Sequence, residues 1–293
     1  MKDPEEKEIM AYIAGLLDGD GSLGIKLGPR GKVCPIIQLH NSCKGMTEYL
    51  KKLFGGCISC DKPKKEGNRP VWRWMLQGTE SCLNFLNKTK NYLIIKNDSA
   101  ELIWEFLTSP VENKDYIELS KSLNLSRKLI DSNLDGLERL ECQSSYFWAY
   151  VAGIMDTDGS FSIEKSIRKP KEGNRQVNNL IKYRPRILLT MVSDLAIKYI
   201  LGNCSFGGYF TVVAQSALKG KACRFNISSR FDAIEFLKKC LPYLQFKTKQ
   251  AVVLLNFCRN YQPTNGLAKV PEEEKQYREN CYKEIMMLNN TPS

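Results

Sequence analysis

The chain carries one twelve-residue segment twice. Residues 11–22, AYIAGLLDGDGS, recur as residues 149–160, AYVAGIMDTDGS, 138 positions later. Eight of the twelve positions are identical, and three of the other four exchange one apolar residue for another. An internal repeat constrains the architecture more than any other feature of a sequence. It predicts two related halves, each of which presents an acidic helix end.

A second pair of segments supports two halves. Residues 92–96, YLIIK, match residues 243–247, YLQFK, at an offset of 151 instead of 138. Pro35 and Pro185 are already 150 apart, so most of the extra residues of the second half are expected in its first hairpin loop. We therefore expect an N-terminal half at 1–109, a linker at 110–143 and a C-terminal half at 144–293.

Hydrophobic periodicity predicts the same order of elements in both halves. In the first half we expect helix 5–19, strands 22–28 and 32–40, helix 45–54, strands 56–62 and 70–77, and helices 80–91 and 97–108. In the second half we expect helix 144–157, strands 160–168 and 180–191, helix 194–201, strands 206–214 and 221–228, and helices 230–241 and 248–260. The linker should hold one or two helices, and a last helix near 271–288 should pack on the outside.

Composition points to nucleic acid as the partner. The formal net charge is +11 and the pI is about 9.0, values that attract polyanions. The sequence contains no apolar run long enough to span a membrane and no apolar signal core at its start. The 11 cysteines are odd in number and mostly lie in apolar patterns, which indicates reduced core thiols of an intracellular protein.

Several common chemistries find no support in the sequence. The pair Cys57 and Cys60 has metal-ligand spacing, but a second pair is missing, so a strand with two small residues is the simpler interpretation. His40 is the only histidine, which excludes histidine-driven catalysis at two equivalent sites. The phosphate-binding pattern GxxxxGK[ST] is also absent.

The repeated motif itself suggests a metal site. Small residues four apart, such as Ala11 and Gly15, let two helix backbones approach closely. If the two motif helices pack together, Asp20 and Asp158 meet at their C-terminal ends, where the helix dipole is negative. Such a cluster suits a hard dication such as Mg²⁺, and two such ions can hydrolyse a phosphodiester. An Asp-Gly pair is also an ordinary helix stop, but its repetition at matched positions favours function.

Two further motif acids, Asp18 and Asp156, are repeated as well. Each is two residues from the acid at the helix end and therefore lies about 200° away around the helix. We expect a structural role for them.

These features resemble the LAGLIDADG homing endonucleases, in the single-chain form with two motifs. The resemblance covers nearly the whole chain and implies an α+β fold: two pseudo-symmetric αββαββα half-domains with the motif helices packed at the centre. The two antiparallel four-stranded sheets would form a DNA-binding saddle. It further implies a monomeric, site-specific endonuclease, associated with intron homing, that cuts one phosphodiester on each DNA strand and leaves short 3′ overhangs.

The resemblance also implies roles for individual residues. Asp20 and Asp158 would be metal ligands and catalytic, and Gly19 and Thr157 would lend backbone carbonyls to the metal. The cofactor would be Mg²⁺, with Mn²⁺ as a substitute and Ca²⁺ binding without cleavage. The remaining implied catalytic residues are Lys96 and Lys247, which would support the phosphate and the water network, and the polar strand-end residue Asn41. The position that matches Asn41 in the second half is Met191, so the two sites could differ in rate.

Strand alternation predicts which residues face DNA. A polar, basic sheet face can enter the major groove, where arginine favours guanine, Gln38 adenine and Glu164 a cytosine amino group. The alternative is an ordinary solvated face, which usually mixes charge signs. In the first half the expected contacts are Ser22, Gly24, Lys26, Gly28, Arg30, Lys32, Gln38, His40, Arg69 and Arg73. In the second they are Ser162, Glu164, Ser166, Arg168, Arg184, Arg186, Thr190, Arg224 and Asn226.

Basic residues in the turns at the sheet edges are better placed for phosphates than for bases. They are Lys62, Lys64 and Lys65 in the first half and Lys169, Lys171 and Arg175 in the second.

Two other functions remain open on the same scaffold. One is an RNA-binding intron maturase, and the other is a transcription regulator that only binds DNA. The presence of both motif acids favours cleavage over either. We expect the protein in an organelle, a chloroplast or a mitochondrion, or in bacterial cytoplasm.

Overall fold

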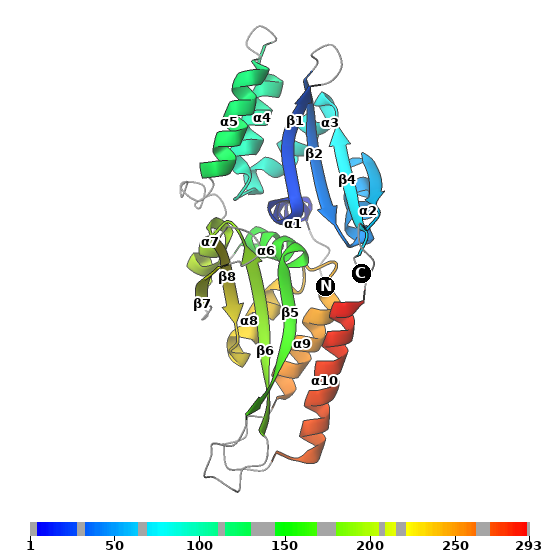
Figure 1. Cartoon of the computed structure of the whole chain (residues 1–293), viewed down its shortest axis with the longest axis vertical. Coiled ribbons are helices and arrows are strands. Elements are labelled where there is room, and N and C mark those ends of the chain that lie inside the picture. Colours follow the sequence, from blue (N-terminus) through cyan, green and yellow to red (C-terminus); the bar gives the residue numbers. More distant parts are fainter. Residues whose placement is uncertain are drawn as a thin grey trace.

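The two halves lie one above the other along the long axis of the molecule, each with its own sheet (Figure 1). The computed structural model describes residues 5–27, 33–63, 69–110, 115–129, 144–168, 180–204, 209–214, 221–261 and 270–291. We call residues 5–110 the first half and residues 144–291 the second half. The helix between them, α5 (Tyr116–Leu129), packs on α4 through its buried residues Leu119 and Leu123.

The element order follows the repeat. The first half contains α1 (Glu6–Asp20), β1 (Gly21–Leu27), β2 (Val33–Asn41), α2 (Lys44–Phe54), β3 (Cys57–Asp61), β4 (Val71–Gln77), α3 (Thr79–Thr89) and α4 (Asn97–Thr108). The second contains α6 (Ser145–Thr157), β5 (Gly159–Arg168), β6 (Leu180–Met191), α7 (Leu195–Asn203), β7 (Tyr209–Ala214), β8 (Lys221–Ile227), α8 (Arg230–Cys240) and α9 (Thr248–Asn260). The sequence did not predict the short 3₁₀ turn Lys90–Tyr92 after α3.

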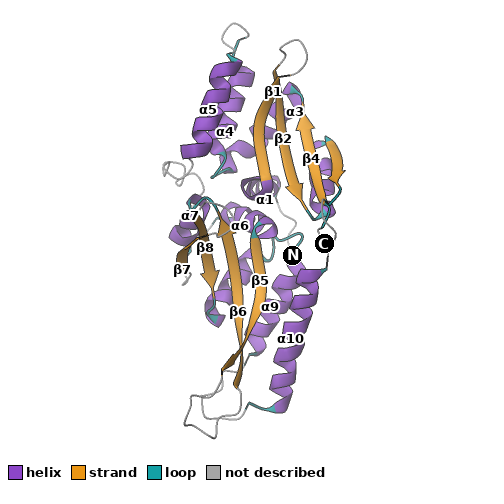
Figure 2. Cartoon of the chain, in the orientation of Figure 1, coloured by secondary structure: helices purple, strands orange, loops and turns teal. Residues whose placement is uncertain are grey.

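Each half builds one four-stranded antiparallel sheet. The strand orders are β1-β2-β4-β3 and β5-β6-β8-β7, so the two sheets have the same topology (Figure 2). One face of each sheet packs on helices: Leu39 and Trp74 are paired and fully buried in the first half, as are Leu189 and Phe225 in the second. This arrangement confirms the predicted α+β fold class.

The extra residues of the second half lie where the offsets predict. The first strands, β1 and β5, begin 138 residues apart, at Gly21 and Gly159, whereas β2 and β6 end 150 apart, at Asn41 and Met191. The hairpin of β5 and β6 therefore contains twelve additional residues. Its paired strands reach Arg168 and Leu180, beyond the length of their counterparts.

The core forms where α1 and α6 cross between the two sheets (Figure 1). A Cβ atom on Gly15 would lie 2.2 Å from the carbonyl oxygen of Tyr150, and one on Gly153 would lie 2.1 Å from that of Tyr12. No side chain fits at that distance, so glycine is required on both helices. The expectation of a close approach between the motif helices is confirmed.

The last helix, α10 (Glu272–Asn290), has no counterpart in the first half. It packs against α9 and β5 through the buried residues Cys281 and Ile285. A Lys165–Glu279 ion pair of 2.7 Å joins it to β5. Within the described ranges, every helix is too short or too polar to serve as a membrane span.

Substitution of Gly15 with alanine should destabilise the protein sharply. The new methyl group would displace backbone, so we expect a loss of about 1–3 kcal/mol or more in the free energy of unfolding, measured by urea denaturation. Gly202→Ala in α7 is the matched control, because its Cβ would meet no heavy atom within 4 Å. That control should be neutral or stabilising by up to about 1 kcal/mol. Equal urea midpoints for the two variants would contradict this account of the helix contact.

Candidate active site

Two aspartates lie at adjacent helix ends in the centre of the molecule. Asp20 is the last residue of α1, and Asp158 is the residue that caps α6. The two ends touch, because a Cβ atom on Gly19 would lie 2.0 Å from the hydroxyl oxygen of Thr157. The structure thus brings together all four residues, Asp20, Asp158, Gly19 and Thr157, that the sequence analysis assigned to a metal.

The pKa values of both acids are raised. Loss of hydration at the helix ends and the negative charge of Asp20 raise the pKa of Asp158 from 3.8 to about 6. Partial burial also raises the pKa of Asp20, although a hydrogen bond from Asn41 opposes that shift. Lys247 and Lys96 stabilise both carboxylates but do not cancel the rise. Burial therefore disfavours the ionised form of both acids, which a bound cation would stabilise.

The ammonium groups of Lys96 and Lys247 bind the C-terminal ends of the motif helices. The Lys96 ammonium donates to the carbonyl oxygens of Leu17 at 2.6 Å and Asp18 at 2.7 Å. The Lys247 ammonium donates to three carbonyl oxygens, those of Met155 at 2.9 Å, Thr157 at 2.8 Å and Gly159 at 2.6 Å. Both lysines therefore bind backbone carbonyls at or next to the C-terminal end of a motif helix. Burial lowers the pKa of each.

Asp18 and Asp156 hold the segments that carry these lysines. Asp18 accepts hydrogen bonds from the backbone N–H groups of Ile94, Ile95 and Lys96 at 2.7–2.9 Å. Its counterpart accepts from residues 245, 246 and 247 at 2.8–3.2 Å. Both aspartates are 2% exposed. These contacts support the structural role expected for the pair.

The sequence analysis missed two tyrosines that bind these aspartates. Tyr150 of α6 donates its hydroxyl to Asp18 at 2.8 Å, and Tyr12 of α1 donates to Asp156 at 2.7 Å. Burial and the adjacent carboxylate raise the pKa of both hydroxyls well above 10.0, so they stay protonated as donors. The signal was present, because the two tyrosines occupy matched positions of the repeat, but the apolar period of the helix also accounts for them.

The two halves differ at the end of the second strand. The Asn41 side chain donates to Asp20 at 2.5 Å and accepts from the backbone N–H of Cys43 at 2.7 Å. Strand register places Met191 at the matching position, where its side chain is buried and offers the motif acid no comparable donor. The difference anticipated from the sequence is therefore present in the structure.

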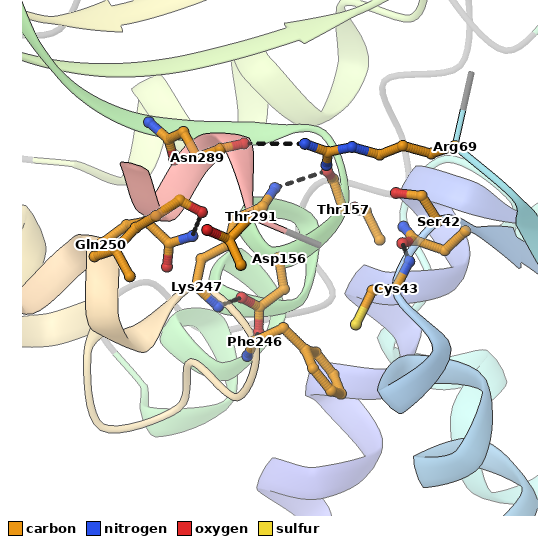
Figure 3. Close-up of a pocket in the computed structure, with 12 residues that line it drawn as sticks. Ser42, Cys43, Arg69, Asp156, Thr157, Phe246, Lys247, Gln250, Asn289 and Thr291 are labelled. Atoms are coloured by element: carbon orange, nitrogen blue, oxygen red, sulfur yellow. Dashed lines mark hydrogen bonds between the residues drawn. The ribbon is translucent and has the colours of Figure 1, made fainter. Parts of the chain in front are cut away.

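A cavity of about 150 Å³ opens beside Lys247 where the halves meet (Figure 3). Its walls include Asn41, Thr157 and Lys247 together with Asn289 near the end of α10. A space of this size, lined by polar groups, can hold several water molecules. The cavity therefore brings water next to Lys247 and Thr157, whereas Asp20 and Asp158 are not among the residues that line it.

The donor set fits a hard dication. Among the described residues there is no cluster of three or more His, Cys, Asp or Glu side chains of the kind that encloses a metal. The site offers two carboxylates and the carbonyl oxygens of Gly19 and Thr157, and the latter already accepts from Lys247. Oxygen donors that leave several positions open suit Mg²⁺, which keeps waters or phosphate oxygens among its ligands.

The sheet faces opposite the core carry most of the expected DNA contacts. Ser22, Gly24, Lys26, Gln38, His40 and Arg73 share that face in the first half, and Ser162, Glu164, Ser166, Arg184, Arg186, Thr190 and Arg224 share it in the second. Lys26, Glu164 and Arg184 are exposed there. Gly28, Arg30 and Lys32 lie outside the described residues, as do Lys64, Lys65, Lys169, Lys171 and Arg175. For Arg168 only the backbone is described.

Of the expected DNA contacts, Arg69 has hydrogen-bond partners in the other half, and Asn226 is nearly buried. The Arg69 guanidinium donates to the carbonyl oxygens of Asn290 at 2.8 Å and Asn289 at 3.4 Å, at the end of α10 (Figure 3). The Arg69 side chain therefore links the first half to the end of α10 in the second half. Asn226 lies on the same face of β8 as Arg224 but is only 5% exposed. Its contact with DNA stays a prediction.

Comparison with solved structures identifies the architecture. I-SmaMI bound to an uncleaved DNA target in the presence of calcium ions aligns over 95% of this chain and 97% of its own, with a TM-score of 0.60 and 14% identity. The LAGLIDADG meganuclease I-AabMI covers 97% and 99% with a TM-score of 0.61 and 14% identity. The I-LtrWI homing endonuclease bound to target DNA covers 98% of both chains with a TM-score of 0.60 and 17% identity.

The chain has the LAGLIDADG homing endonuclease fold. No family model matches the sequence, and no curated protein matches it. The chain therefore shares this fold with proteins to which it is only 14–17% identical. Nearly complete coverage of both chains includes the two halves together, as in the single-chain form that the sequence resembles.

Replacement of Asp158 with asparagine should stabilise the metal-free protein at pH 7.5. A carboxyl whose pKa is raised on folding costs stability once it is ionised, so the cost grows as the pH rises from about 4 to 6 and is full above that range. Although the atoms packed around the Asp158 carboxyl take away part of its hydration, the residue as a whole is exposed, so solvent screens its charge and we expect a rise in Tm on the order of 2 °C.

The pH dependence is the internal control for this variant. At pH 4 both proteins carry a protonated or neutral group at position 158, so their Tm values should converge. Asp20→Asn should gain less at pH 7.5, since it also disturbs the hydrogen bond from Asn41. A lower Tm for Asp158→Asn at pH 7.5, or a gain that persists at pH 4, would show that the acid is not under electrostatic stress.

Proposed function

We propose that this protein is a site-specific double-stranded DNA endonuclease of the homing type. The observation that carries the proposal is the meeting of two acidic helix ends at the centre of two basic sheet faces. The enzyme binds one long DNA site along the saddle and hydrolyses one phosphodiester on each strand, which leaves short 3′ overhangs. It acts as a monomer, because one chain supplies both halves of the site.

The cofactor is Mg²⁺, held by Asp20 and Asp158 with help from the carbonyls of Gly19 and Thr157. When bound, the metal activates water and stabilises the charge that develops on the leaving oxygen. Mn²⁺ substitutes, and Ca²⁺ binds without cleavage. The calcium-containing complex of I-SmaMI with an uncleaved target supports this last expectation.

Lys96 and Lys247 contribute positive charge close to the scissile phosphates. Their pKa values are lowered by burial, so either ammonium gives up a proton more readily than a surface lysine does. Asn41 orients the carboxylate of Asp20 through the bond of 2.5 Å. Water reaches the second site through the cavity beside Lys247.

DNA is read by the exposed side chains of the saddle. Lys26, Arg73, Arg184, Arg186 and Arg224 supply the positive charge, and the polar residues around them select bases. Because the two faces differ, the target is asymmetric. Retention of both acids favours cleavage over the alternative of an RNA-binding maturase. The enzyme works in the compartment that holds its target, an organelle or bacterial cytoplasm.

Cleavage of a randomised duplex library tests the proposal. With Mg²⁺, selected products should share one long site cut on both strands with short 3′ overhangs. Asp20→Asn and Asp158→Asn should each slow cutting by about 100-fold or more, since each removes a charge that holds the metal. DNA affinity measured with Ca²⁺ should stay within about threefold of the original. Tight binding with no cut in any divalent metal would refute the endonuclease.

The two strands should be cut at unequal rates. The site that contains Met191 lacks the donor that Asn41 provides, so its strand should be nicked about tenfold more slowly. Nicking of each strand is followed with separate end labels on one duplex. Asn41→Met should lower the nicking rate of the faster strand toward that of the slower strand, and the rate of the slower strand should stay nearly unchanged. Equal rates in the original protein would contradict the assignment.

A further inference from the structure

We propose that Tyr12 and Tyr150 are positioning residues that act across the two halves. Each tyrosine fixes the lysine-bearing segment of the opposite half, so that the second half supports the site of the first and the first supports that of the second. The inference rests on the proposed function only for its catalytic consequence. The crossed arrangement itself is a property of the fold.

The support of Lys96 begins in the second half. Tyr150 of α6 donates to the Asp18 Oδ2 atom at 2.8 Å, and the same oxygen accepts from the backbone of Ile94 and Ile95. The other oxygen of Asp18 accepts from the backbone N–H of Lys96. One carboxylate therefore ties a helix of the second half to the residue whose ammonium binds the end of α1.

The support of Lys247 runs in the opposite direction. Tyr12 of α1 donates to the Asp156 Oδ2 atom at 2.7 Å, and this oxygen also accepts from the backbone of Gln245 and Phe246. The remaining oxygen accepts from the backbone of Lys247 at 2.8 Å. The two networks match donor for donor and are related by the symmetry of the repeat.

Burial makes these hydrogen bonds consequential. Tyr12 is 3% exposed, Tyr150 is 0% exposed and both aspartates are 2% exposed, so water has little access to replace a lost donor. A hydrogen bond to a buried carboxylate is stronger than an ordinary one, and its loss leaves charge poorly compensated. Removal of a tyrosine hydroxyl should therefore loosen the segment that the aspartate holds.

A merely structural role predicts a different pattern. If the tyrosines only stabilised the packing of α1 against α6, then removal of either hydroxyl would weaken one shared interface and affect both sites alike. The crossed arrangement predicts that each variant affects one segment, and that the affected segment lies in the half that does not contain the substitution.

Tyr12→Phe and Tyr150→Phe provide the test, since phenylalanine keeps the ring and removes only the hydroxyl. Hydrogen exchange of the full-length protein, followed by mass spectrometry, reports the amides that the aspartates bind. Tyr150→Phe should speed exchange at 94–96 by about fivefold and leave 245–247 unchanged, and Tyr12→Phe should do the reverse. Tyr49→Phe is the matched control: Tyr49 packs edge-on against Tyr12 at 6.2 Å and donates its hydroxyl to no described residue. It should change neither segment.

Strand-specific nicking carries the same test to catalysis. Lys96→Met and Lys247→Met first reveal which DNA strand each lysine serves. Tyr150→Phe should then slow the strand that depends on Lys96, and Tyr12→Phe the strand that depends on Lys247, by about threefold to tenfold each. DNA affinity with Ca²⁺ should not change in either variant.

The two readouts separate the possible failures. Equal loosening of both segments in either variant, or loosening in neither, overturns the inference. If the original protein cuts no DNA, the proposed function fails, and the exchange pattern still decides whether the support is crossed. The inference is also overturned if Tyr150→Phe slows the strand that depends on Lys247, or if Tyr12→Phe slows the strand that depends on Lys96. Equal slowing of both strands by either variant overturns it as well.

Discussion

The contact of two glycines in the centre of the molecule fixes the position of everything around it. At Gly15 and Gly153 the backbones of α1 and α6 meet without an intervening side chain. Both motif helices end within one to two turns of this point. Because a helix is rigid over that length, the contact also fixes the distance between Asp20 and Asp158. The acidic site is therefore a direct consequence of helix packing and does not depend on a flexible loop.

The same geometry concentrates negative charge at the two helix ends, and residues distant in the sequence compensate part of it. Both motif helices end in acidic residues, and neither has a basic residue in its last turn. Negative helix ends and negative side chains therefore add up at one place. Lys96 and Lys247, which are far away in sequence, bring their ammonium groups to the carbonyls there. The lysines remain buried because they are bound on several sides, and the acids keep raised pKa values because the compensation is partial.

The architecture could be predicted from the sequence, whereas only some details of the site could be. Repetition was sufficient to predict the order of the elements, the hairpin insertion and the meeting of Asp20 and Asp158, and the family resemblance pointed to the difference at Met191. The commitment of Arg69 to the carbonyls of α10 could not be predicted, since α10 lies outside the repeat and its end meets the first half only in three dimensions.

Comparison of the halves separates what the protein repeats from what it varies. The groups at the junction of the helices are matched nearly atom for atom, down to the tyrosine–aspartate pairs. On the sheet faces, Arg73 and Arg224 occupy equivalent positions, but Lys26 is replaced by Glu164. An exchange of opposite charges at matched places cannot read the same base. On the proposed function, the symmetry of the centre thus constrains where the duplex is cut, and the asymmetry of the faces requires that its two half-sites differ.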